Sequence, residues 1–142
     1  MSGTGGGIST IDSSRQRGAA AVIQGCFEAS ARHGFVVADS RRAANRVIEM
    51  ACAKHPRLIA ARLKPAVLAA FALTTVLKEV DELPGLRLVY AQALGSIVIA
   101  LSGAQLSRPE FSTALDALRA LMDFYRAFTD QSRSCRASSS AT

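Results

Sequence analysis

Hydrophobic residues are densest between Pro65 and Leu106, where they run almost all the way round two successive helical segments. The sequence Leu83-Pro84-Gly85 in the middle of this stretch predicts a turn, so that the two segments form a helical hairpin. A helix that is apolar on every side belongs in the interior of a protein, where other elements cover it. The pattern therefore predicts that the rest of the chain packs around this hairpin.

Two segments before the hairpin carry apolar residues on one face only. The first covers residues 12–33 and ends before Gly34, since glycine adopts the left-handed conformation that stops a helix. The second covers residues 40–54 and follows Asp39 or Ser40 as its capping residue. The apolar positions of the two segments are Ala19, Val22, Ile23, Cys26, Phe27, Ala44, Val47, Ile48 and Ala51. This pattern predicts two amphipathic helices that cover the hairpin.

Prolines punctuate the chain between these helices and the hairpin. His55-Pro56 ends the second helix, because the residue before a proline is forced out of the α-helical region. Pro56 then starts a short third helix, residues 56–63, and Lys64-Pro65 repeats the break. The apolar run Phe35-Val36-Val37 is too short for a strand without a partner, and we expect it to be a loop that fills part of the core.

A final helix is predicted to begin after Ser107. Ser107 is a capping residue with Glu110 three positions later and Pro109 in the first turn. The helix has large apolar residues at helical spacing, which are expected to cover the hairpin: Phe111, Leu115, Leu118, Leu121, Met122, Tyr125 and Phe128. A second stripe alternates in charge and is expected to be a solvated face: Ser112, Asp116, Arg119, Asp123, Arg126 and Asp130.

Length and composition agree with a helical interpretation. The chain has 142 residues, the size of one domain, and its 49% of hydrophobic residues are dominated by helix-forming Ala and Leu. We predict an all-α fold, a single-domain bundle of five to six helices around a central apolar helical hairpin. The helical domain covers residues 10–130, while the terminal segments 1–9 and 131–142 are expected to be disordered.

Cysteine content and hydropathy bear on where the protein works. Three cysteines without framework spacing do not indicate a secreted disulfide scaffold, and we expect a cytoplasmic location. Residues 88–107 carry no charge over the ~20 residues that a transmembrane helix needs, so membrane association is an alternative. Against insertion, Gln92 and Gln105 interrupt this stretch, and the amphipathic helices need an apolar surface to cover. The pattern favours a soluble bundle over a membrane partner.

Positive charge is concentrated in one part of the chain. The formal net charge is +6, and residues 39–64 contribute +5 of it through seven basic and two acidic side chains. Such a cluster can neutralise nucleic-acid phosphates or meet an acidic protein surface, although long basic side chains also serve simply to solvate outer helix faces. The candidate binding residues are Arg41, Arg42, Asn45, Arg46, Lys54, Arg57, Arg62 and Lys64.

No combination of residues gives a specific sign of catalysis or metal binding. Cys52 and His55 are three positions apart and can share a helical face, but zinc needs three or four ligands and no paired motif supplies the others. His33 and His55 both stand at predicted helix C-termini, where an imidazole commonly interacts with the helix dipole. We therefore expect no catalytic residues, no metal, no cofactor and no enzymatic activity.

The leading hypothesis is a small non-catalytic interaction or regulatory protein that binds a protein partner through a helical face. Self-association as a homodimer is one form of this hypothesis, and an apolar strip left uncovered on the final helix would indicate it. DNA binding by the basic helices of residues 40–64 is the first alternative, and a membrane-associated helical protein is the second.

Overall fold

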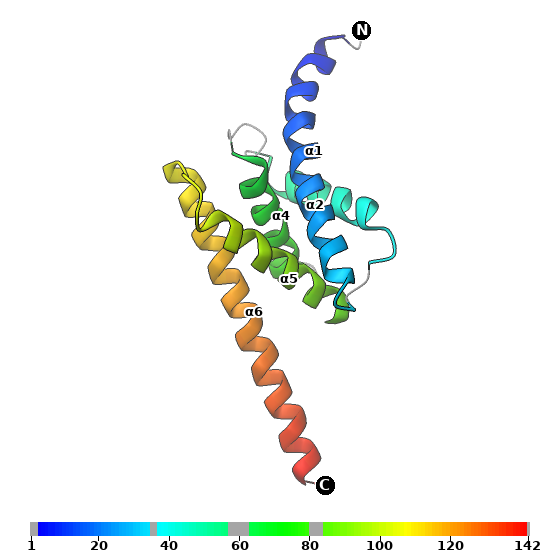
Figure 1. Ribbon diagram of the computed structural model, residues 1–142, viewed down its shortest axis with the longest axis vertical. Helices are drawn as coiled ribbons and strands as arrows, with labels where there is room; N and C mark the ends of the chain where they lie inside the picture. The colour runs from blue at the N-terminus through cyan, green and yellow to red at the C-terminus, as the bar shows by residue number, and fades with distance from the viewer. Residues whose placement is uncertain (1–2, 35–36, 57–62, 80–83, 142) are drawn as a thin grey trace.

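The computed structural model describes residues 3–34, 37–56, 63–79 and 84–141 and, within these ranges, the side chains of residues 14–130. It contains the helices α1 (Gly3–Ala31), α2 (Ser40–Lys54), α4 (Pro65–Glu79), α5 (Pro84–Leu101) and α6 (Arg108–Ala141). All regular secondary structure in these ranges is helical, and the helices pack against one another (Figure 1). The predicted all-α bundle of five to six helices is confirmed.

α4 lies at the centre of the bundle. Ten of its fifteen residues are buried, and between Val67 and Leu77 only Phe71 is partly exposed. The hydroxyls of Thr74 and Thr75 are satisfied inside the helix, because they donate to the carbonyl oxygens of Ala70 (2.8 Å) and Phe71 (3.2 Å). All four other helices contact α4, so this helix is the centre of the predicted apolar hairpin.

α5, the second helix of the hairpin, begins two residues earlier than the sequence indicates. Pro84 and Gly85, expected in the turn, are the first two residues of the helix. Proline is favoured in this first position because its missing N–H is not needed there and its fixed φ suits a helix. α5 is also less enclosed than α4, since Ile99 is 75% exposed.

α2 is amphipathic in the predicted register. Ala44, Val47, Ile48 and Ala51 are buried, and Arg42, Asn45, Arg46 and Glu49 are exposed. Its cap is Asp39, whose carboxylate accepts the backbone N–H of Arg42 at 3.0 Å. The sequence leaves Asp39 and Ser40 as alternatives for this cap, and the geometry assigns it to Asp39.

α1 packs across the bundle through a glycine. Ile23 and Phe27 are fully enclosed, and a Cβ atom added at Gly18 would lie only 3.2 Å from two side-chain atoms of Pro65. α1 therefore passes the start of α4 so closely that an alanine at this position would require the neighbouring atoms to shift by a few tenths of an ångström. The helix ends in a tight turn that leads to Gly34, whose φ of +88° is the left-handed conformation expected from the sequence.

The starts of α4 and α6 are joined by one carboxylate. Glu110 is 4% exposed and accepts the backbone N–H of Lys64 at 2.9 Å and the backbone N–H of Ser107 at 3.0 Å. The hydroxyl of Ser107 also donates to Glu110 at 3.0 Å, and the predicted capping box is confirmed. The bond to Lys64, which is 46 positions away, converts a local cap into a connection between two helices.

Arg87 makes a second connection, at the opposite end of α4. Its Nη2 donates to the carbonyl oxygen of Leu77 at 2.9 Å, which satisfies one of the last carbonyl groups of α4. The guanidinium of Arg87 lies 5.3 Å from the centre of the Phe124 ring of α6, within the range of a cation–π interaction. Arg87 thus links α4, α5 and α6.

Some predicted boundaries differ from the structure or lie outside it. α1 and α6 extend into the segments expected to be disordered, residues 3–9 and 131–141. Helix propagation adds one hydrogen bond for each residue ordered, so a helix that is anchored in a core extends at small cost. The predicted short helix of residues 56–63 falls mainly on residues outside the described ranges, as do Phe35 and Val36.

Replacement of Glu110 by Ala is expected to lower the free energy of unfolding at pH 7 by about 1–3 kcal/mol, because buried hydrogen-bond donors lose their acceptor. Hydrogen bonds from the backbone N–H groups of Ser107 and Lys64 lower the pKa of Glu110 from 4.5. Its stabilising contribution is therefore complete above pH 4.5 and lost as the pH falls through the lowered pKa.

Chemical denaturation of both proteins between pH 3 and pH 7 checks this expectation. The difference in unfolding free energy between the wild type and Glu110→Ala should narrow in acid. The exposed Glu49 supplies a control, and Glu49→Ala should change stability by no more than about 0.5 kcal/mol. A loss at Glu110 no larger than that at Glu49 would contradict the role assigned to this carboxylate.

Candidate interaction site

An apolar surface lies on α6. Five large side chains on one face of this helix are between 38% and 56% exposed. We call them the outer face of α6: Phe111, Leu115, Leu118, Met122 and Tyr125. The sequence predicts that these residues cover the hairpin, and for these five the prediction is wrong.

The bundle is instead covered by a different face of α6. Ala117, Ala120, Leu121 and Phe124 are buried, with no more than 9% exposure. The small side chains of Ala117 and Ala120 allow a close approach, and Gly95 of α5 leaves room for Leu121, whose Cδ2 would lie 3.6 Å from a Cβ added there. Close backbone packing by small residues decides which face turns inward, and the larger residues remain outside.

The outer face has the spacing of a coiled-coil seam. Phe111, Leu115, Leu118, Met122 and Tyr125 follow one another at intervals of four, three, four and three residues. This alternation keeps apolar side chains along one line of a helix and is the pattern by which two helices pack side by side. α6 therefore has two apolar faces, one used within the bundle and one left open.

A groove adjoins the N-terminal half of the outer face. It has a volume of about 390 Å³ and is bounded by the end of α5 on one side and the start of α6 on the other. Its lining is mostly apolar: Val98, Leu101, Ser102, Ala104, Leu106, Phe111, Ala114, Leu115 and Leu118. The groove and the outer face share three residues, so they form one continuous apolar surface.

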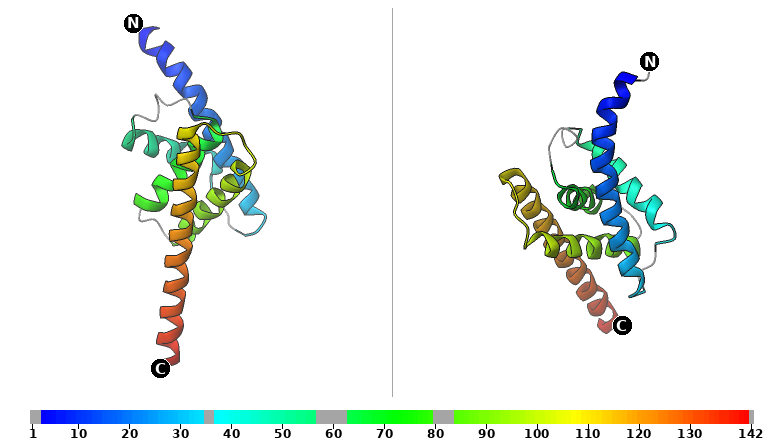
Figure 2. Two further views of the ribbon diagram at one scale, coloured as in Figure 1. Left: turned by 90° about the vertical axis from the view of Figure 1, so that its left-hand side faces the viewer. Right: turned by 45° about the horizontal axis from the view of Figure 1, so that its top comes forward.

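The C-terminal half of α6 has no such neighbour. Among the side chains of α6 that the structure describes, which end at Asp130, Phe124 is the last that is buried, and every residue from Tyr125 to Asp130 is exposed. Figures 1 and 2 show this half of α6 running past the other helices and away from the bundle. Its apolar side chains, Tyr125 and Phe128, therefore meet solvent in a single copy of the chain.

A charged stripe runs beside the outer face. Asp116, Arg119, Asp123, Arg126 and Asp130 are all exposed, and their charges alternate in sign along the helix. This agrees with the solvated face expected from the sequence. Among the side chains described for residues 112–130, none of these five forms an ion pair within the 4 Å limit of a salt bridge.

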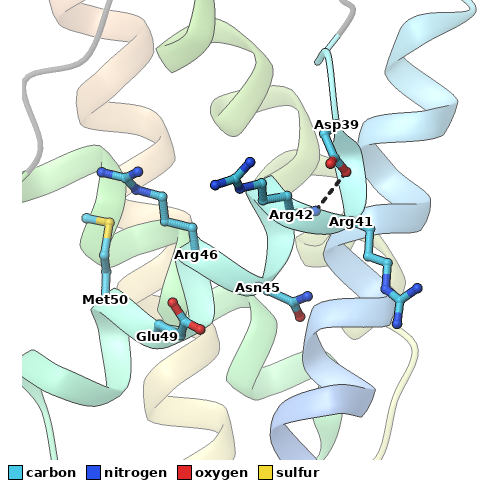
Figure 3. Close-up of a pocket in the computed structure, with 7 residues that line it drawn as sticks. All are labelled: Asp39, Arg41, Arg42, Asn45, Arg46, Glu49 and Met50. Carbon is cyan, nitrogen blue, oxygen red and sulfur yellow. Dashed lines mark hydrogen bonds between the residues drawn. The ribbon is translucent and has the colours of Figure 1, made fainter.

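The structure brings together four of the eight predicted basic-cluster residues. Arg41, Arg42, Asn45 and Arg46 line an open hollow on the surface of α2, together with Asp39, Glu49 and Met50 (Figure 3). Arg42 and Arg46 extend to the same side of the helix, whereas Arg41 points to the other side. The two carboxylates in the hollow offset part of its positive charge.

Of the other four predicted residues, the two that the structure describes, Lys54 and Lys64, do not line this hollow. Lys54 pairs with Glu79 of α4, with Nζ 2.5 Å from the carboxylate, and this hydrogen bond lowers the pKa of Glu79. Lys64 donates from its ammonium group to the backbone carbonyl of Gln105. Arg57 and Arg62 lie outside the described residues. The described residues of the cluster thus fall into two groups. Four line the hollow on α2, and the two lysines make contacts within the fold.

His55 and the cysteines take structural positions. The His55 ring stands edge-on to Phe71 with 5.0 Å between ring centres, and its Nε2 lies 3.9 Å from the Glu79 carboxylate. Cys26 and Cys52 are half-buried, and burial raises the pKa of the Cys26 thiol. His55 therefore packs against the middle and the C-terminal end of the central helix.

The described residues form neither a metal site nor a membrane-spanning helix. Within the described ranges, no group of three or more His, Cys, Asp or Glu residues is arranged to hold a metal ion. No helix in the same ranges combines the length and the apolar character that crossing a membrane requires. The chain matches no protein-family model, no curated protein and no solved structure.

Substitutions on the two faces of α6 are expected to affect the stability of the fold differently. Leu118 is exposed, so Leu118→Ser should change the free energy of unfolding of dilute protein by no more than about 0.5 kcal/mol. Leu121 is buried against Gly95, and Leu121→Ala should cost about 2–5 kcal/mol. Urea denaturation of both variants measures the difference, and equal losses would place Leu118 inside the bundle.

Proposed function

We propose that this chain is a small helical interaction protein that binds a protein partner through the outer face of α6. The observation that carries the proposal is the exposure of five large apolar side chains on one face of a helix whose other face is already used in the bundle. Soluble proteins rarely leave a contiguous apolar surface of several hundred Å² uncovered unless it binds something.

The shape of this surface favours a helical partner. The four-three spacing of the outer face suits a second helix, and the adjoining groove of α5 and α6 supplies room for large side chains from that helix. The proposed role is binding without catalysis, in the cytoplasm, as expected from the sequence. The charged stripe beside the outer face would form the polar rim that surrounds such contacts.

Photo-crosslinking in the native cell tests this proposal. A photoreactive phenylalanine analogue at position 118, on the outer face, should form an adduct of defined mass because the partner covers it. The same analogue at position 127, which is exposed on the other side of the helix, should form none. No adduct at 118, or equal adducts at both positions, would contradict binding through the outer face.

The α2 hollow supports nucleic-acid binding as a second candidate function. Arg41, Arg42 and Arg46 are exposed on neighbouring turns, where they can reach phosphate groups of a DNA backbone. Asp39 and Glu49 in the same hollow weaken its attraction for an anion. The outer face of α6 therefore remains the better supported site.

Duplex DNA binding at two salt concentrations tests the second candidate. If two arginines neutralise about two phosphates, the logarithm of the binding constant should fall against the logarithm of the salt concentration with a slope near −2. The double variant Arg42→Ser, Arg46→Ser should abolish this salt dependence. Ser112→Ala on α6 serves as a neutral control. Undetectable binding at low salt, or binding unchanged in the double variant, would eliminate this function.

A further inference from the structure

We propose that the partner of the outer face of α6 is a second copy of this chain, with the two α6 helices side by side and antiparallel. This inference rests on the proposed function and names the partner that it leaves open. A twofold axis relates the two copies and crosses the contact at the level of residue 120 along α6. Such a contact is closed, because each copy offers the same surface and no further copy can add to the pair.

The spacing of the outer face fits itself in this orientation. With the axis near Ala120, Leu118 of one copy lies opposite Met122 of the second copy, and Leu115 lies opposite Tyr125. The four-three spacing has two alternating positions, called a and d in a coiled coil. Each a residue of one helix then lies opposite a d residue of the other, as in antiparallel coiled coils. The two pairs and their symmetry equivalents form four layers along the contact, and every layer consists of apolar residues of the outer face.

The two halves of α6 also complement each other. The N-terminal half carries the apolar groove, and the C-terminal half projects from the bundle with Tyr125 and Phe128 exposed. Antiparallel pairing sets the projecting half of each copy against the groove of the other. Each bundle packs on the opposite, buried face of its own α6, so the two bundles do not lie between the paired outer faces.

The charged stripe supports the antiparallel orientation. In an antiparallel pair the two stripes run along the same edge of the contact, and Arg119 faces Asp123 of the second copy while Arg126 faces Asp116. In a parallel pair each stripe would instead face the apolar groove side of the other helix. Within one copy these four side chains form no ion pair among the described residues, so their charges are available across the contact.

The area of the outer face is close to the lower limit for a specific dimer. Large side chains present about 150–250 Å² each, so exposures of 38% to 56% for five of them amount to roughly 450 Å² per copy. Two copies together would remove about 900 Å² from water, and the groove residues beside the outer face bring this near the ~1,000 Å² of the smallest specific interfaces. We therefore expect a dissociation constant in the micromolar range.

Sedimentation equilibrium of the full chain measures the association. In reducing buffer, protein between about 1 µM and 300 µM should fit a monomer–dimer equilibrium, with no larger species. Met122→Glu should weaken the dimer at least about tenfold, because two carboxylates would be buried in the seam. Ala127→Glu adds the same charge on the other side of the helix and should leave the dimer unchanged.

A charge-exchange experiment tests the orientation. Arg119→Glu places acid opposite acid, and Asp123→Arg places base opposite base, so each variant alone should self-associate more weakly than the wild type. A mixture of the two variants restores both opposite-charge contacts and should form a heterodimer about three- to tenfold tighter than either homodimer. Mixing changes no contact within one helix, so altered folding cannot produce this preference.

The outcomes separate this inference from the proposed function. A wild-type chain that stays monomeric at every concentration overturns the second copy as partner, and an adduct of a different protein at position 118 would then preserve the proposed function. A monomeric chain with no adduct at 118 overturns both. A wild-type dimer in which the mixed variants show no preference overturns the antiparallel pairing.

Discussion

The structure depends on the need to cover α4 on every side. Ten of its residues are buried, and each of the other helices supplies part of the enclosure. α1 reaches it through Gly18, α2 through a face of alanine, valine and isoleucine, and α6 through Ala117 and Ala120. Small residues dominate these contacts because four helices around one leave little space for larger side chains.

Covering α4 with the alanine face of α6 determines what remains outside. The carboxylate of Glu110 fixes the start of α6 to the start of α4, and Arg87 holds Phe124 near the other end of α4. Between these two points the rotation of α6 is set, and its large apolar side chains are turned toward solvent. The exposed surface is therefore a consequence of how the core is closed, and a second protein surface is the natural element to cover it.

Features that depend on neighbours in the sequence could be predicted from it. The inward face of α2, the glycine stop after α1 and the capping box of Ser107 and Glu110 all follow from local chemistry. The choice between the two apolar faces of α6 could not be predicted, because it depends on Gly95 and on alanines that carry little hydrophobic signal. The division of the basic cluster could not be predicted from the sequence either. Lys54 and Lys64 bind Glu79 and Gln105, which are distant in the chain.

Amide hydrogen exchange along α6 tests the central claim most directly, because residues 125–130 are all exposed within one copy. In a monomer this part of the helix opens easily and its amides exchange quickly, whereas a second helix packed on the outer face would protect them. We expect slow exchange that becomes slower as the protein concentration rises. Fast exchange of residues 125–130 at every concentration, with slow exchange confined to residues 110–124, would contradict a second helix on the outer face.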